Sequence, residues 1–173
     1  MLDPRIAQLL DKQELAELTM RYCRGVDRGD RELIQSCYHP DGQDDHGPNM
    51  GICSPAEFAE RIVPIVRSFA AWQHSLGGQL FDLHGDEAFG ETYFTFHSVG
   101  EEDSQDLSSF GRYLDHFQRR GGQWRIYRRT VVLDWRGEYR AHRQDLGGWV
   151  RGLPNRNDVS YDIVAATSRN QTD

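Results

Sequence analysis

The apolar residues change their spacing near Trp72, and this change limits the possible fold more than any other feature of the chain. Before Trp72 they recur at helical intervals, and after it they alternate with polar residues as far as Trp135. Strands are predicted over residues 73–83, 88–99, 108–119 and 123–135, joined in part by short glycine-containing turns that are typical of antiparallel hairpins. Helices followed by long antiparallel strands predict the α+β class: a cone-shaped roll of N-terminal helices packed on a curved antiparallel sheet, with an internal pocket.

The first helix is predicted from Asp3 to Gly29. Asp3-Pro4 suits a helix start, because aspartate caps the first turn and proline fits within it. Apolar residues form two stripes along this helix, so it is expected to be covered on two sides. A short helix over 31–37, a strand over 42–47 and a helix over 54–71 are predicted to follow.

Composition limits the class of protein. The 173 residues fit an α+β domain, residues 1–135, followed by a C-terminal tail, residues 136–173, that covers the pocket or mediates assembly. A formal charge of −7 argues against nucleic acid or an anionic membrane as a partner. No apolar run approaches the roughly 18 residues that cross a bilayer. The three cysteines follow no ligand spacing and are typical of reduced thiols, so a cytoplasmic location is predicted.

Asp27 is the residue of the first helix that most needs a partner. At about 100° per residue, it falls on the same side of the helix as Ala16, Met20 and Cys23. That side is expected to be buried, and a lone buried carboxylate is strongly unfavourable. The sequence therefore predicts a partner elsewhere in the chain, and His74 is the candidate.

His74 begins the first long predicted strand, with Trp72 and Leu76 on the same face. It can be a core histidine held by one backbone hydrogen bond. It can also be a general base, provided that a carboxylate such as Asp27 holds one ring nitrogen and leaves the other free. The sequence contains no G-x-S-x-G motif and no cysteine in an activating setting. A base without a nucleophile predicts proton abstraction followed by elimination or isomerisation.

Further polar side chains are expected in the pocket. Asp44 and His46 share one face of the short predicted strand. With His74 they can form an iron site of two histidines and one carboxylate, but a polar pocket wall explains them equally well. We predict no metal and no cofactor. Arg128 and Arg129 lie on opposite faces of the last strand, and whichever points inward needs a carboxylate or an anionic substrate.

Several segments resemble a known family in order and spacing. They are RYCRGVDRGD, YHPDGQDDHG, the histidine after the third helix, and GRYLDHFQRRGGQWRIYRRTVVLDW. They are similar to the SnoaL-like branch of the nuclear transport factor 2-like superfamily, over roughly Leu9 to Trp135. The resemblance implies the cone-shaped α+β fold of that family. Its members include polyketide cyclases, scytalone dehydratase, hexachlorocyclohexane dehydrochlorinase and bile-acid dehydratase.

The resemblance also implies roles for individual residues. Asp27 would orient His74 as the base. Tyr22 would line the same pocket, although it precedes Asp27 by five positions, a step that turns a helix by about 140°. The implied substrate-binding residues are Tyr22, Asp44, His46, Tyr113 and Arg129. The implied partner is a small molecule, and because relatives are often dimers or trimers, a homo-oligomer is expected.

We therefore predict a cofactor-independent lyase of the dehydratase type that acts on a small cyclic or aromatic hydroxylated substrate. His74 is the predicted base, and Asp27 orients it through a hydrogen bond of about 2.7–2.9 Å. An isomerase or polyketide-type cyclase with the same base is an alternative. So is the non-catalytic small subunit of a ring-hydroxylating dioxygenase, because one fold serves many functions.

Overall fold

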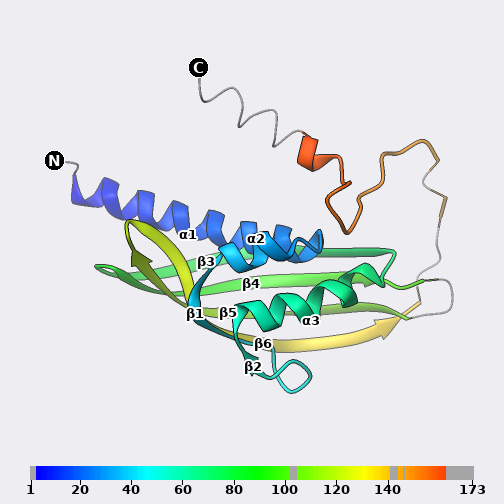
Figure 1. Cartoon of the computed structure of the whole chain (residues 1–173), viewed down its shortest axis with the longest axis horizontal. Coiled ribbons are helices and arrows are strands. Elements are labelled where there is room, and N and C mark those ends of the chain that lie inside the picture. The colour runs from blue at the N-terminus through cyan, green and yellow to red at the C-terminus, as the bar shows by residue number, and fades with distance from the viewer. Residues whose placement is uncertain (1–2, 102–104, 141–143, 146, 163–173) are drawn as a thin grey trace.

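The computed structural model describes residues 3–101, 105–140, 144–145 and 147–162 (Figure 1). The helices are α1 (Pro4–Asp27), α2 (Arg31–Ser36) and α3 (Pro55–Arg67). The strands are β1 (Tyr38–Asp45), β2 (Ile52–Cys53), β3 (Ala71–His84), β4 (Glu87–Val99), β5 (Asp106–Arg120) and β6 (Gln123–Tyr139). The α+β class predicted from the sequence is confirmed.

The strands form one sheet in the order β2-β1-β6-β5-β4-β3. The four long strands pair antiparallel with their sequence neighbours, as predicted. At the other edge β1 runs parallel to β6, a pairing that was not predicted. Alternation of apolar residues reveals which face a strand buries but not which strand it pairs with, so this contact was not foreseen. The short strand β2 was also not predicted, and β6 extends beyond its predicted end at Trp135.

Local sequence signals explain where the helices begin and end. The Asp3 side chain accepts a hydrogen bond from the backbone N–H of Arg5 at 2.9 Å and caps α1. α3 begins with a capping box, in which Ser54 and Glu57 each satisfy the other's backbone N–H. After α1 the chain turns at Gly29, whose φ of 53° lies in the left-handed region that favours glycine.

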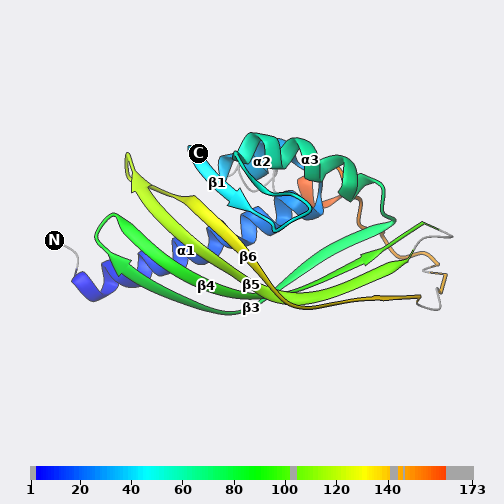
Figure 2. The same cartoon turned by 90° about the horizontal axis from the view of Figure 1, so that it is seen from below.

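All three helices lie on one face of the sheet, which curves around them (Figure 2). α1 contacts β3, at one edge, and also β6, three strands away in the sheet order. The alternating side chains that point toward the helices form the core with the inner sides of the helices. Fully buried members include Leu15, Leu18, Tyr22, Ile34, Phe58, Val66, Tyr113, Phe117 and Ile126. The core therefore fills the hollow of the curved sheet, and α1 spans that hollow.

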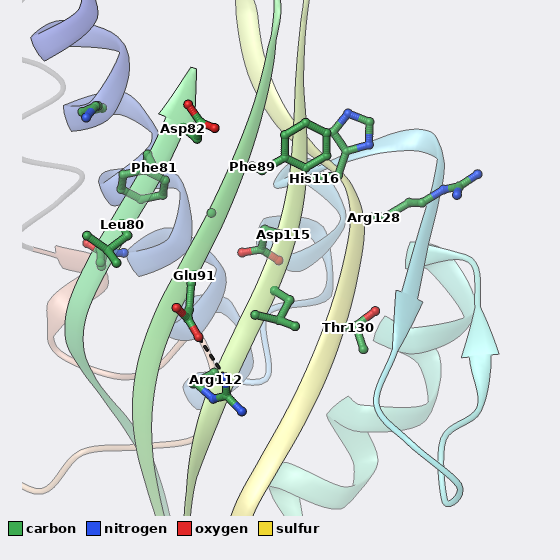
Figure 3. Close-up of a pocket in the computed structure, with 14 residues that line it drawn as sticks. Leu80, Phe81, Asp82, Phe89, Glu91, Arg112, Asp115, His116, Arg128 and Thr130 are labelled. Carbon is green, nitrogen blue, oxygen red and sulfur yellow. Dashed lines mark hydrogen bonds and ion pairs between the residues drawn. The ribbon is translucent and has the colours of Figure 1, made fainter. Parts of the chain in front are cut away.

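The other face of the sheet carries no helix (Figure 2). A hollow of about 830 Å³ lies mainly on this face and is lined by residues such as Leu80, Phe89, Arg112 and His116 (Figure 3). Arg112 donates a hydrogen bond to Glu91 at 2.9 Å at its rim. Neither Asp27 nor His74, the pair predicted from the sequence, lines this hollow. The hollow is therefore separate from the site described below. No described helix has the length and apolar character that a membrane span requires.

The tail returns to the end of α1. Arg156 donates hydrogen bonds to Asp30 at 3.2 and 2.9 Å, and the Tyr161 hydroxyl donates to the same carboxylate at 2.7 Å. Arg28 approaches Asp158 at 3.5 Å. The segment 153–162 is thus held at the corner between α1 and α2, by contacts with Arg28 and Asp30, one and three residues beyond Asp27. That the tail covers a pocket or mediates assembly stays a prediction.

Candidate active site

Asp27 and His74 are in direct contact. The Nδ1 atom of His74 lies 2.6 Å from Oδ1 of Asp27, slightly closer than the predicted range. The backbone N–H of His74 also donates to the same carboxylate, at 3.2 Å to Oδ1 and 3.0 Å to Oδ2. The two side chains are only 10% and 12% exposed. The last turn of α1 therefore holds its carboxylate against the start of β3, and the carboxylate holds both the ring and the backbone of His74.

The other ring nitrogen of His74 is free to react. Because ionised Asp27 only accepts hydrogen bonds, it selects the tautomer with the proton on Nδ1 and the lone pair on Nε2. Nε2 has no hydrogen-bond partner among the described residues. Apolar rings surround the imidazole: its centroid lies 4.9 Å from that of Phe96 and 6.2 Å from that of Phe94. A nitrogen base with a free lone pair in an apolar setting can remove a proton from a bound molecule.

A second aspartate–histidine pair lies at the end of β1. Nδ1 of His46 is hydrogen-bonded to Oδ1 of Asp44. The Tyr38 hydroxyl donates to the other carboxylate oxygen at 2.5 Å. The hydroxyl of Tyr22 lies 3.2 Å from Nε2 of His46, and the His46 ring stacks on Phe58 with centroids 4.4 Å apart. Both imidazole nitrogens and both carboxylate oxygens of this pair are therefore engaged within the protein.

Arg129 is the inward arginine, and it meets a carboxylate. Its side chain is fully buried, and its Nε and Nη2 atoms each donate to Asp115 at 2.7 Å. Its guanidinium also lies 4.1 Å from the ring centroids of both Tyr22 and Tyr113. Burial raises the pKa of the Asp115 carboxyl, and the charge of Arg129 opposes that shift. Burial also holds the pKa of both tyrosines well above the usual value, so their hydroxyls stay protonated.

The buried cysteines are poor nucleophiles. Burial raises the pKa of the Cys23 thiol to about 12 and that of Cys37 to about 11, so neither forms a thiolate near neutral pH. Within the described residues, no group of three or more histidine, cysteine, aspartate or glutamate side chains is arranged to hold a metal ion. Among the groups described above, Nε2 of His74 is the one with a lone pair that can accept a proton.

The sequence-predicted residues fall into two groups. Asp27 and His74 form the first pair. The other predicted residues form a connected network beside it: Tyr22, Asp44, His46, Tyr113 and Arg129. Tyr22 points away from Asp27 toward the residues after β1, as the turn of the helix between them implies.

Sequence reasoning missed two members of this network, Tyr38 and Asp115. Asp115 lies directly opposite Arg129 in the pairing of β5 with β6, which a register prediction for the last hairpin could have found. The hydrogen bond from Tyr38 to Asp44 joins two residues of β1 across a register shift, and no sequence signal points to it.

Comparison with known proteins identifies the family of the chain. The SnoaL-like domain matches residues 7–130, which is most of the chain. The chain belongs to the SnoaL-like domain family. Its fold is that of the nuclear transport factor 2-like superfamily, as predicted. No curated protein sequence matches it.

Several solved structures share this SnoaL-like fold. A candidate scytalone dehydratase from Novosphingobium aromaticivorans DSM 12444 superposes with a TM-score of 0.70 at 17% identity, covering 83% of this chain and 97% of the other. Hexachlorocyclohexane dehydrochlorinase LinA-type3 from Novosphingobium barchaimii LL02 gives 0.69 at 16%, covering 78% and 94%. A protein of unknown function from Mycobacterium tuberculosis gives 0.66 at 22%, covering 76% of each chain. At these identities the likeness shows the fold alone.

Proposed function

We propose that this SnoaL-like protein is a cofactor-independent lyase that eliminates water from a small cyclic or aromatic hydroxylated substrate. The observation that carries the proposal is the Asp27–His74 pair, in which the carboxylate holds Nδ1 at 2.6 Å and Nε2 is left without a partner among the described residues. Two structural neighbours carry the names of elimination enzymes, a dehydratase and a dehydrochlorinase, which supports the same class of reaction.

In the proposed reaction, Nε2 of His74 removes a proton from a substrate carbon. The electron pair of that C–H bond forms a carbon–carbon double bond as the C–O bond on the neighbouring carbon breaks. The departing hydroxide takes the proton from the imidazolium and leaves as water. Asp27 keeps the reactive tautomer in place and stabilises the imidazolium while it exists.

We assign the connected network to the wall of the pocket. Hydrogen bonds join Tyr22 to His46, His46 to Asp44 and Arg129 to Asp115, whereas Nη1 of Arg129 has no partner among the described residues. Such a network gives the pocket a rigid polar side beside the base. Direct contact of the substrate with Tyr22, Asp44, His46, Tyr113 and Arg129 stays a prediction.

The test is turnover by the wild-type protein and by His74→Ala on a small panel: 3-hydroxycyclohexanone, its benzo-fused analogue and hexachlorocyclohexane. General base catalysis contributes roughly 10²–10⁴-fold, so the variant should lose most turnover and keep its circular dichroism and melting temperature. Equal turnover by the two proteins would rule out the proposal. Deuterium exchange at the substrate carbon without loss of water would instead favour an isomerase or cyclase.

A further inference from the structure

The outer face of the sheet carries a hollow that the proposed reaction does not use. Its volume, about 830 Å³, lies within the roughly 300–1,000 Å³ that is typical of small-molecule sites. Most of its lining comes from β3, β4, β5 and β6, on the face that no helix covers (Figure 3). A molecule bound there would be separated by the sheet from His74, which faces α1.

The antiparallel register places the outer-face lining in two neighbouring rows. From β3 to β6, the first row is Asp82, Phe89, His116 and Arg128, and the second is Leu80, Glu91, Leu114 and Thr130. Directly opposed Cβ atoms in such rows are about 4.5–5.5 Å apart, and two residues along a strand span about 7 Å. Across these rows the large apolar side chains come from β3, β4 and β5, whereas β6 contributes a guanidinium and a hydroxyl group.

The apolar side chains of the two rows are open to solvent. Leu80 is 69% exposed, Phe89 49% and Leu114 40%. The Phe89 ring stacks on the imidazole of His116, with centroids 4.7 Å apart and ring planes 15° from parallel. A contiguous exposed apolar patch commonly marks a binding site, and this one suits the flat hydrocarbon part of a ligand.

Arg128 supplies a positive charge that the protein does not neutralise. Arg112, the other arginine of the lining, has ion pairs with Glu91 at 2.9 Å and with Asp134 at 3.1 Å. Arg128 lies over the Tyr127 ring, 5.2 Å from its centroid, but it has no hydrogen bond or ion pair within the part of the chain that the structure describes. A guanidinium presents a planar fork of donors that matches a carboxylate.

Thr130 lies beside this charge. It is two residues after Arg128 on β6, so both side chains point to the same face of the sheet. Its side chain is exposed, and its hydroxyl group can donate a second hydrogen bond to the same anion. Lys12 also lines the hollow, but it belongs to α1, and its ammonium is a strongly hydrated point charge. The β6 end of the hollow therefore has the donors that suit a carboxylate.

A second copy of the chain is a less suitable occupant. Glu91, Arg112 and Asp134 form a charged cluster near the middle of the outer face. The cores of protein–protein interfaces are depleted of charged residues, and this cluster separates the hollow from the exposed Phe110 and Trp135 farther along the strands. The hollow is thus a local apolar patch next to one free charge, which favours a small molecule.

We propose that the hollow on the outer face is a second ligand site and that it binds a small aromatic carboxylate. The aromatic rings lie on the three exposed apolar side chains, and the carboxylate points to β6. There it accepts hydrogen bonds from the guanidinium of Arg128 and from the hydroxyl group of Thr130. The site does not depend on the proposed function, because neither Asp27 nor His74 contributes to it.

The acidic side chains of the lining are compatible with this orientation. Asp82 belongs to β3, which is the strand of the hollow farthest from Arg128. Glu91 is paired with Arg112, and Asp115 is buried in its own ion pair on the inner face. A ligand whose charge lies at β6 therefore keeps its apolar part between its carboxylate and Asp82.

The first experiment compares an anion with its neutral counterpart. In titration calorimetry, the wild-type protein should bind naphthalene-2-carboxylate more tightly than 2-naphthalenemethanol. A hydrogen bond to a charged group contributes about tenfold or more to an equilibrium constant, so Arg128→Gln should lose that factor for the carboxylate and lose the preference. Arg125→Gln, on the same strand but outside the hollow, is the matched control and should keep it. A wild-type protein without the preference, or an Arg128→Gln variant that retains it, would overturn the proposal.

The second experiment tests the apolar part of the site. Leu80→Ser should weaken the binding of both ligands by a similar factor, because it removes a contact that both make. Ile52→Ser is the matched control, because Ile52 on β2 is also 69% exposed and lies outside the hollow. Both variants should keep the melting temperature of the wild type. Undiminished binding by Leu80→Ser would mean that the rings lie elsewhere, and the proposed site would be wrong.

The third experiment locates the ligand by the imidazole resonances of two histidines. Naphthalene-2-carboxylate should shift the resonances of His116 and leave those of His74 in place, and His74→Ala should bind it as tightly as the wild type. Shifts at His74 without shifts at His116 would put the ligand in the candidate active site and refute the second site. None of these measurements requires turnover, so the lyase and the second site can fail separately.

Light scattering distinguishes a small ligand from a second copy of the chain. The molar mass should be the same for the wild-type protein and for Phe89→Ser, because the outer hollow stays open in solution. An oligomeric wild type that Phe89→Ser dissociates would show that a second copy covers the hollow, and the ligand site would be withdrawn.

Discussion

Two of the aspartate–histidine pairs among the described residues are shielded from solvent, unlike the exposed pair of Asp82 with His84, and they differ in what the second imidazole nitrogen meets. In both pairs a carboxylate binds Nδ1 of the histidine. Nε2 of His46 is bonded to the hydroxyl of Tyr22, whereas Nε2 of His74 has no partner among the described residues. We call Asp27–His74 the open pair and Asp44–His46 the closed pair.

The carboxylates are also held differently. Asp27 accepts the backbone N–H of His74, so the helix end and the strand are joined at this point. Asp44 is 0% exposed and accepts from the side chain of Tyr38. The open pair therefore orients one imidazole toward the interior of the curved sheet. The closed pair joins β1 to α1 through side chains that already satisfy one another.

The difference teaches that an aspartate beside a histidine does not by itself make a base. What matters is whether one ring nitrogen retains a free lone pair and whether that lone pair meets a space that a substrate can enter. Under the proposed function, the open pair is the catalytic one and the closed pair has a structural role. The variants below test that division, in order of decreasing effect.

Replacing the carboxylate in each pair gives the largest contrast. In Asp27→Asn the amide no longer selects the reactive tautomer of His74, and kcat should fall by about 10²–10⁴. Asp44→Asn should cause a far smaller loss of kcat and a lower melting temperature. The measurements are steady-state kinetics and thermal unfolding of both variants. Equal losses of kcat would erase the distinction between the open and closed pairs.

Asp115→Ala should lower the free energy of unfolding, because it acts on the buried ion pair with Arg129. The substitution removes both hydrogen bonds from Arg129 and leaves a guanidinium buried without its counter-ion. Breaking a buried ion pair from one side typically costs about 3–5 kcal/mol, and urea denaturation would measure it. Glu91→Gln, which weakens the surface ion pair with Arg112, is the matched control and should cost about 0–1 kcal/mol. Similar costs for the two would show that Arg129 does not depend on Asp115.

His46→Gln tests the closed pair more gently. Glutamine is polar and can keep part of the bonding to Asp44 and Tyr22, but the ring stacked on Phe58 is lost. We expect the free energy of unfolding to fall by about 1–2 kcal/mol, with kcat much closer to that of the wild type than in His74→Gln. If kcat falls as far as it does in His74→Gln, the closed pair also takes part in the reaction.

Part of this division could be predicted from the sequence. Helical geometry predicted that Asp27 lies on a buried side, and Asp27 and Cys23 are buried. The rest of that prediction is wrong, because Met20 on the same side is 50% exposed and the first apolar stripe is covered only near the end of α1. Burial of Asp27 demanded a partner, and His74 was the histidine at the start of a strand facing inward. The same geometry placed Tyr22 on another side of the helix, and the structure has it bonded to His46. Periodicity is enough for such inferences, because it determines which face of an element each side chain occupies.

The closed pair could not be predicted in the same way. Its bonds depend on where β1 lies, and β1 pairs parallel with β6 across a long stretch of intervening chain. Apolar alternation carries no information about that pairing, so the contact between Tyr38 and Asp44 had no sequence signal. For Arg129 the sequence predicted that an inward arginine needs a carboxylate. It did not identify Asp115 as that carboxylate, because the register of β5 with β6 was not predicted.

The smallest predicted effect concerns the tail, which braces α1 at the end that carries the open pair. Burial disfavours ionisation of Asp158, but hydrogen bonds from Ser160 and from the Leu153 backbone N–H outweigh it and lower the pKa from 3.8 to about 2. A lowered pKa stabilises the docked tail above the pKa of the free carboxyl, about 3.9, and this stabilisation is lost as the pH falls toward 2. Hydrogen exchange in residues 153–162, corrected for the intrinsic pH dependence of amide exchange, should therefore accelerate as the pH falls from about 4 to about 2.

Asp158→Asn should make that exchange faster at neutral pH and independent of pH in this window. Because the tail holds Arg28 and Asp30, close to Asp27, the imidazole resonances of His74 should shift in this variant. The resonances of His46 should stay in place, because the closed pair is held by β1 and by Tyr22, which lies farther from the tail-bound end of α1. Equal shifts at both histidines would mean that the two pairs are coupled through α1 and that the open pair is not braced separately.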